Sequence, residues 1–237
     1  MQELIAGKLS THGFESFWVD PVCDMVERIL KVPLDSDSGG FTLAQVQTGD
    51  RLNELEFYFP LQRLSESTLK DLFSRNVKIA AGPEFRTISE PTTPRVAEGG
   101  FAGIPSRMER LRFKPLEGFM KGFIDLVFSF RDRFYIVDWK SNFLGNRIED
   151  YHQAALTEAM EESFYHLQYH LYTIAVHKYL QTRMPGYSYD SHFGGVYYIF
   201  LRGVNPAQGK HYGIYRHRPS SAAIEALCSN LIGKVAQ

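Results

Sequence analysis

The chain contains 237 residues, of which 44% are hydrophobic, and its formal net charge at pH 7 is −1. This length suits one sizeable α/β domain with a real hydrophobic core, and the near-zero charge argues against a domain that binds DNA through a strongly basic surface of its own. The two cysteines, Cys23 and Cys228, lie in apolar helical contexts, which favours buried free thiols in a reducing compartment over a disulfide or a metal site. No apolar run is long enough to span a membrane and no signal peptide is recognisable, so we expect a cytoplasmic protein without a membrane partner.

The first half of the chain alternates between helical and extended patterns. Apolar residues at helical spacing predict a helix over residues 15–31, and residues 52–60 have the aromatic, alternating character of a strand. Residues 61–76 again place leucines at helical spacing. Residues 82–115 are rich in Pro, Gly, Thr and Arg, and we interpret them as a long surface excursion within one domain that spans residues 1–237.

A predicted β-hairpin carries the most informative residues. Residues 123–130 and 134–139 are runs of Ile, Val, Leu, Phe and Tyr around a short polar turn. Each predicted strand contains a carboxylate between apolar neighbours, Asp125 in the first and Asp138 in the second, and an unpaired carboxylate is costly to bury. Lys140 follows Asp138 by two residues, so the period of a strand places both side chains on one face.

This trio of side chains suits phosphodiester hydrolysis. Carboxylates are hard oxygen ligands for Mg²⁺, which is commonly held by one or two protein carboxylates together with water and substrate phosphate oxygens. Such a metal acidifies a bound water and neutralises charge that develops on the phosphate, and Lys140 can orient the water or stabilise the same charge. We therefore expect Asp125 and Asp138 to bind Mg²⁺. The alternative for an isolated Asp-x-Lys sequence is a solvated strand end.

The second half of the chain continues the α/β pattern. Residues 151–183 predict a long helical region with a break near Glu162-Ser163. Residues 192–202 predict a further core strand, and residues 220–235 predict a last helix.

Four stretches, GFMKGFIDLVF, YIVDWKSNFLG, LQYHLYTIAVHKYL and HFGGVYYIFLRGV, resemble in order and spacing the RecB-type nuclease domain, a member of the PD-(D/E)XK superfamily. The resemblance runs from about residue 14 to residue 219, which is nearly the whole chain. It implies a restriction-endonuclease-like fold, in which a mixed β-sheet is flanked by helices. It also implies Mg²⁺-dependent cleavage of DNA, with in-line attack of an activated water on phosphorus and departure of the 3′ oxygen.

The resemblance implies further site residues. In this family a glutamate on the strand before the hairpin contributes to the active site, and Glu54 matches it by spacing, with Glu56 in reserve; the alternative is a solvent-facing pair. A Gln-Tyr-x-x-Tyr element follows the Asp-x-Lys strand in the family, and Gln168, Tyr169 and Tyr172 match it. The resemblance implies that Gln168 and Tyr172 line the site, whereas the helical spacing alone favours core and rim residues.

The histidines do not complete this site. We interpret His166 and His170, which lie in the predicted long helical region, as helix surface or rim rather than zinc ligands. RecB-type nucleases usually have a metal-binding histidine on a helix before these motifs, and His12 aligns after that helix. We therefore expect a fragment of a longer subunit that begins too late to include this histidine, with a metal site that is incomplete on its own.

The resemblance implies a setting in the helicase–nuclease subunit of bacterial RecBCD recombination-repair complexes. Its implied partners are single-stranded DNA, the RecC and RecD subunits and the recombinase RecA. No Gly-x-x-x-x-Gly-Lys-Ser/Thr loop occurs, so ATP would be used only by a motor outside this chain, which would deliver the strand. A basic cluster before the hairpin is either a phosphate-contacting rim or a solvated loop; it consists of Arg107, Arg110, Arg112, Lys114 and Lys121.

Two other functions remain open at this point. The first is a protein-interaction module that contacts RecC and loads RecA, with weak or no cleavage by the chain alone, and exposed apolar positions in residues 151–183 would favour it. The second is a nuclease of the same fold with another task, such as a CRISPR-associated or phage exonuclease. The presence of only two cysteines argues against the type that binds an iron–sulfur cluster through four.

Overall fold

A mixed five-stranded sheet, in the order β1-β2-β3-β4-β5, forms the centre of the computed structural model, which describes residues 1–34, 40–65, 67–72 and 116–233. Its strands are β1 (Arg51–Leu64), β2 (Leu116–Phe130), β3 (Arg133–Lys140), β4 (Phe193–Phe200) and β5 (Ile214–His217). Neighbouring strands are antiparallel except β3 and β4, which are parallel. The predicted α/β class is confirmed, and the mixed sheet flanked by helices is consistent with a restriction-endonuclease-like fold.

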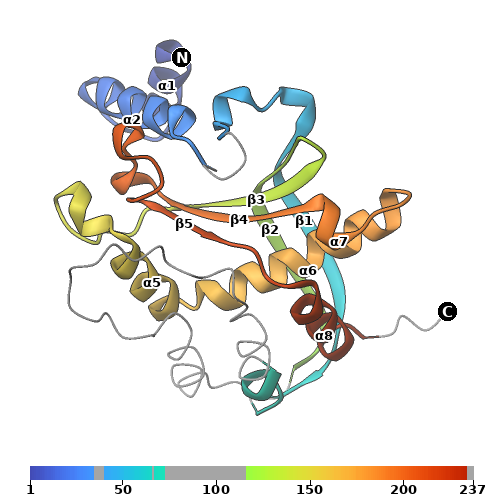
Figure 1. Ribbon diagram of the computed structural model, residues 1–237. Helices are drawn as coiled ribbons and strands as arrows, with labels where there is room; N and C mark the ends of the chain where they lie inside the picture. The colour runs from blue at the N-terminus through green and yellow to red at the C-terminus, as the bar shows by residue number, and fades with distance from the viewer. Residues whose placement is uncertain (35–39, 66, 73–115, 234–237) are drawn as a thin grey trace, which may run out of the picture.

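Helices cover both faces of the sheet (Figure 1). The α-helices are α1 (Gln2–Thr11), α2 (Val19–Lys31), α5 (Gln153–Glu162), α6 (Tyr165–Arg183), α7 (Tyr189–His192) and α8 (Ser221–Leu231). Short 3-10 helices lie at Ser16–Trp18, Leu43–Gln45, Thr48–Asp50, Ile148–Tyr151, Leu201–Gly203 and Pro206–Gln208. None of the helices in the described ranges is long and apolar enough to cross a membrane.

Two hydrophobic cores lie on opposite faces of the sheet. On one face, α2 and the segment around Phe41 pack over Phe128 and Val137. On the other face, α5, α6 and α8 pack over Ile124 and Ile136. Because both faces of β3 and β4 are covered, the central residues of these strands are largely apolar and aromatic, and Asp138 within β3 is an exception.

The parallel pair of strands explains where α6 lies. Two parallel neighbours require a crossover connection, and α5 and α6 provide it between β3 and β4. Helix α6 therefore runs across one face of the sheet, beside the end of β3 that carries Lys140 (Figure 1).

Strand β2 changes its partners along its length. Its segment Leu126–Phe128 pairs with both β1 and β3, whereas residues 116–124 pair only with β1 within the described part of the chain. Ile124 packs into the core beneath α6 and Leu126 into the core beneath α2, although residues two apart in a regular strand share a face. The strand is thus distorted at Asp125, and beyond this point β1 and β2 form a two-stranded arm that bends away from β3 (Figure 1).

Several predicted elements are confirmed, with shifted ends. Helix α2 occupies most of the predicted helix 15–31, β2 and β3 form the hairpin, and β4 lies in the predicted strand 192–202. Helix α8 lies within the predicted helix 220–235. The predicted break in the long helical region separates α5 from α6, where Phe164 has a left-handed backbone with φ 55°.

The helix predicted over residues 61–76 is wrong at its start. Strand β1 continues through Leu64 by pairing with β2, so strand pairing overrides the helical spacing of the leucines. The helix covers residues 67–72 within the described part of the chain. The surface excursion predicted at 82–115 lies outside the described residues and stays a prediction, as does the single-domain organisation.

Candidate active site

Strands β2 and β3 separate at Asp125, and this side chain spans the gap. The regular pairing of the two strands ends at Leu126 and Val137. One residue further, Oδ2 of Asp125 accepts a hydrogen bond of 2.8 Å from the backbone N–H of Trp139. The Asp125 carboxylate therefore takes the place of a backbone carbonyl as the acceptor for the Trp139 N–H where the strands diverge. This hydrogen bond holds the carboxylate beside the end of β3.

Asp138 and Lys140 both lie near the end of β3, and both are buried. Their exposed fractions are 3% and 8%, and the Lys140 ammonium forms an ion pair with Oδ2 of Asp138. Burial raises the pKa of the Asp138 carboxyl, the ion pair with Lys140 opposes this rise, and the nearby charge of Asp125 adds to it. The structure thus places the predicted trio of side chains in one region, and it puts Asp138 and Lys140 side by side as the strand period predicted.

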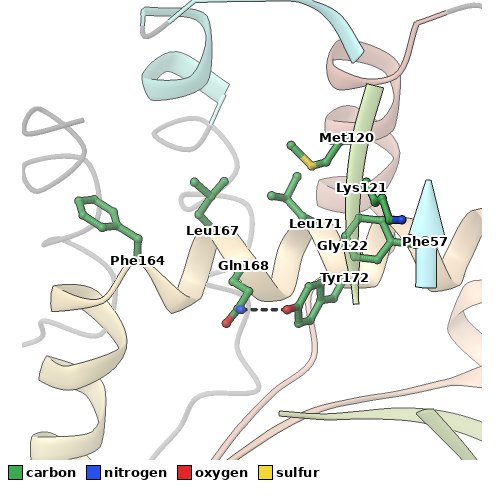
Figure 2. Close-up of a pocket in the computed structure, with 9 residues that line it drawn as sticks. All are labelled: Phe57, Met120, Lys121, Gly122, Phe164, Leu167, Gln168, Leu171 and Tyr172. Carbon is green, nitrogen blue, oxygen red and sulfur yellow. Dashed lines mark hydrogen bonds between the residues drawn. The ribbon is translucent and has the colours of Figure 1, made fainter. Parts of the chain in front are cut away.

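Helix α6 contributes an amide that fixes the lysine. Gln168 Oε1 accepts hydrogen bonds of 3.0 Å from the Lys140 ammonium and 3.0 Å from the Tyr198 hydroxyl. Gln168 Nε2 donates a hydrogen bond of 2.9 Å to the Tyr172 hydroxyl (Figure 2). The Lys140 Nζ also lies 3.6 Å from the centroid of the Tyr165 ring and 4.9 Å from that of Tyr198. The ammonium is therefore held by one carboxylate, one amide and two aromatic rings.

The Tyr172 hydroxyl remains protonated at neutral pH. Burial raises its pKa to about 12, and the negative charges of Asp138 and Asp125 contribute to the rise. A neutral hydroxyl that accepts a hydrogen bond from Gln168 can still donate its own proton. It can therefore act as a hydrogen-bond donor to an anionic group, and it does not serve as a base.

Glu54 lies beside this site with an unusual backbone. The flanking pairs Asn53–Leu126 and Leu55–Ile124 place it opposite Asp125 on β1. Its φ of 50° is uncommon for a residue other than glycine, and its side chain is exposed. The reserve candidate, Glu56, instead forms an ion pair of 2.8 Å with Lys121, and both of these side chains are about half exposed.

Comparisons with known proteins identify relatives along nearly the whole chain, although no protein-family model matches it. The chain is 37% identical over 92% of its length to "RecBCD enzyme subunit RecB" of Escherichia coli strain K12. It is 35% identical over 85% of its length to the RecB subunit of Haemophilus influenzae and 33% identical over 82% to that of Mycobacterium tuberculosis. This chain is related to RecB. It spans only 16%, 14% and 18% of the lengths of these three RecB proteins.

The predicted resemblance to RecB is therefore confirmed. The individual roles of the site residues stay predictions, because the relatives establish kinship and the structure establishes only position. Asp125, Asp138, Lys140, Gln168 and Tyr172 lie together, with Glu54 at the margin and Glu56 in a separate ion pair.

Sequence reasoning missed Tyr198 and Tyr165. Tyr198 is the neighbour of Asp138 in the parallel register of β3 and β4, and its hydroxyl is one of two in the strand, the other belonging to Tyr197. Tyr165 donates a hydrogen bond of 3.1 Å to Oδ1 of Asn142, just after β3. The two adjacent tyrosines of the predicted core strand were the available signal, and the sequence alone does not say which of them faces Asp138.

The interpretation of His166 and His170 as surface or rim residues is wrong. Both are buried, because they face the sheet: the ring of His166 packs against Tyr215 and that of His170 against His217, both on β5. Tyr169 turns toward these histidines rather than toward Lys140, and its hydroxyl lies 3.2 Å from Nδ1 of His166. Of the predicted basic cluster, Lys121 alone lies within the described residues.

The oxygen ligands present fit Mg²⁺ but do not enclose it. Asp125 and Asp138 supply hard carboxylate oxygens, and apart from the Lys140 ammonium no donor in the described residues reaches the buried Oδ2 of Asp138. No group of three or more His, Cys, Asp or Glu side chains in the described ranges is placed to hold a metal. A magnesium ion at this RecB-like site would therefore depend on water and substrate oxygens for most of its ligands.

Proposed function

We propose that this chain is the DNA-cleaving part of a RecB-type subunit and that it hydrolyses phosphodiester bonds of single-stranded DNA with Mg²⁺. The observation that carries the proposal is the clustering of two carboxylates and a buried lysine where β2 and β3 diverge, held by Gln168 from α6. The kinship with RecB supports it independently. We also propose the setting of the relatives, a RecBCD-type complex with RecC and RecD, for this chain.

Asp125 and Asp138 would hold the metal. When bound, Mg²⁺ would lower the pKa of a bound water and neutralise charge that develops on the phosphate. The Lys140 ammonium, which is anchored by Gln168, would stabilise the same charge. The Tyr172 hydroxyl, which stays protonated, can donate a hydrogen bond to a phosphate oxygen. Attack in line with the scissile bond would release the 3′ oxygen.

Metal titration of the chain, alongside cleavage of a labelled single strand, tests the proposal. We expect weak calorimetric binding of Mg²⁺ or Mn²⁺, because the side chains of the described residues do not enclose the ion, together with metal-dependent cleavage, and we expect both to be lost in Asp138→Ala. The matched control is Asp24→Ala, which removes an exposed carboxylate of α2 and should change neither measurement. Metal-dependent cleavage that persists in Asp138→Ala would contradict the assigned site.

A second candidate function is a protein-interaction module that contacts RecC and loads RecA. The predicted signal, exposed apolar positions in residues 151–183, is weak, because Tyr179 is the only large hydrophobic side chain exposed in this range. Exposed aromatic side chains do occur on the outer face of the β1–β2 arm, where Tyr58 and Phe119 are each 64% exposed and stack at 4.8 Å. Capture of purified RecC or RecA by Asp138→Ala, lost when Tyr58 and Phe119 are changed to Ser, would favour this function.

A further inference from the structure

An open groove of about 350 Å³ adjoins the candidate active site, between α6 and the β1–β2 arm. Gln168 and Tyr172 belong to the wall of the groove and also to the hydrogen-bonded cluster around Lys140. Figure 2 shows them on one side of α6, while Leu167 and Leu171 project from the adjoining side. The groove is thus continuous with the site that we propose for phosphodiester cleavage.

The rest of the groove is apolar and aromatic. Met120 lines it from β2, and Phe57 lines it from β1. The Phe57 ring lies 5.7 Å from the Tyr172 ring in an edge-to-face arrangement, which links the groove wall to the site. Gly122 makes room for this ring, because a Cβ atom there would lie 2.5 Å from Phe57. The surface offered is suited to a flat ligand with an apolar face.

Phe164 lines the groove where α5 gives way to α6, in an uncommon backbone conformation. Its φ of 55° and ψ of 27° fall in the left-handed region, which is unusual for a bulky residue. Such strained positions are concentrated at ligand-binding sites, where the fold holds a side chain in a required place. The ring forms a wall of the groove about one helical turn from Gln168.

Charge at the groove is nearly balanced. Lys121 is the one charged residue among those that line it, and this lysine is paired with Glu56. A phosphate group would therefore find little attraction there, whereas a nucleobase presents an apolar π-face that stacks on aromatic and aliphatic side chains whatever its sequence.

We propose that this groove binds an unpaired nucleobase adjacent to the scissile phosphate. The inference rests on the proposed function, and it explains why the substrate would be a single strand. A base seated between α6 and the arm cannot remain paired in a duplex. The groove holds one nucleobase of the strand, and the adjacent phosphate lies at Asp125, Asp138 and Lys140.

Binding of single strands in EDTA tests the groove separately from cleavage. We would measure fluorescence anisotropy at low salt, where binding is strongest, with a set of 12-nucleotide single strands, each lacking the base at one successive position. For the unaltered chain we expect one or two adjacent abasic positions to weaken binding about five- to hundredfold, the range measured for loss of one stacked base. In Phe164→Gly and in Leu171→Ala that abasic penalty should largely disappear.

Two variants distinguish loss of the groove from loss of folding. Phe164→Gly removes the ring and suits the left-handed backbone, so it should fold at least as stably as the unaltered chain. Tyr179→Ala is the control on the same helix, because its side chain is exposed outside the groove, and it should keep the full abasic penalty.

Each outcome decides between the two proposals. The groove proposal is overturned if the unaltered chain shows no abasic penalty or if both groove variants keep it. It is also overturned if no binding can be measured. An apolar protein segment would then be the better candidate for the groove. Abasic dependence without Mg²⁺-dependent cleavage of the same strands supports the groove and overturns the proposed hydrolysis. Mg²⁺-dependent cleavage that is unaffected by every missing base supports the proposed hydrolysis and overturns the groove proposal.

Discussion

At the scale of single residues, Gln168 connects the parts of the site. Its carbonyl oxygen accepts from Lys140 and Tyr198, and its amide nitrogen donates to Tyr172. Gln168→Leu would leave a buried ammonium and a buried hydroxyl without this acceptor, so we expect a loss of about 1–3 kcal/mol in the free energy of unfolding. We also expect cleavage to fall about 10- to 100-fold, as is typical when a group that orients a metal-site residue is removed.

The matched variant is Tyr172→Phe, which removes one hydroxyl and leaves the lysine and its acceptor intact. It should lower the free energy of unfolding by about 1 kcal/mol or less. Urea unfolding and cleavage of a labelled strand measure both effects. If Tyr172→Phe proved as damaging to stability as Gln168→Leu, the central role assigned to the amide would be wrong.

Glu54 offers a second test at this scale, because its φ of 50° should reverse the usual order of stability of a glycine and an alanine substitution. A Cβ atom in the left-handed region is unfavourable by about 1–2 kcal/mol, so Glu54→Gly should be more stable than Glu54→Ala by about 1 kcal/mol. Arg51, an exposed residue of β1 without such a φ, should show the opposite order, with Arg51→Ala the more stable. Thermal and urea unfolding of the four variants check this.

The same variants test the function of Glu54. If its carboxylate takes part in cleavage, Glu54→Gly and Glu54→Ala should lose activity to a similar extent despite their different stabilities. Full activity in Glu54→Gly would assign the carboxylate no role.

At the scale of elements, α6 buries titratable side chains behind the site. Its His166 and His170 pack near His217 of β5, and burial lowers the pKa values of these three histidines to about 3, 4 and 3. The unfolded chain takes up protons at these residues below about pH 6.5, while the folded chain does not until the pH is much lower. The free energy of unfolding should therefore fall with decreasing pH, by roughly 1.4 kcal/mol per histidine for each pH unit below about 6.5.

Urea unfolding at pH 7.5 and pH 5.5 measures this loss of stability. His217→Phe should reduce the pH dependence of the free energy of unfolding by the contribution of one histidine. His12→Ala, which removes an exposed histidine, should leave it unchanged. A free energy of unfolding that is equal at both pH values would show that the buried histidines are not held neutral.

The same helix shows which parts of the site could be predicted from sequence. The shared face of Asp138 and Lys140 follows from the strand period alone, and it was predicted. The burial of His166 was not, because α6 has no apolar stripe and polar residues occur all around it, so that only tertiary packing decides which are enclosed. Tyr198 depends on the parallel register of β3 and β4, and the backbone of Glu54 depends on the distortion opposite Asp125; neither is encoded in a local pattern.

At the scale of the whole molecule, the net charge of −1 favours the part of the proposed function in which a motor outside this chain delivers the DNA strand. We expect the chain alone to bind a single strand only weakly at physiological salt, because few phosphates would be neutralised. Fusion to a single-strand-binding module should raise cleavage at low substrate concentration by about 10²-fold through effective concentration. A fusion that carries Asp138→Ala is the control and should not cleave, and nanomolar affinity of the unfused chain would contradict the prediction.

The separation of β2 from β3 also affects how the molecule behaves in concentrated solution. Along residues 116–124 one edge of β2 has no strand partner within the described residues, so backbone N–H and C=O groups line a seam beside the groove. An exposed edge of this kind can pair with an edge from another copy, and charged side chains and irregular backbone are common defences against such aggregation. The Lys121–Glu56 pair and the positive φ of Gly118 lie on this arm and are defences of this kind. The opening that we propose for a substrate strand is therefore also the part of the molecule where association between copies has to be prevented.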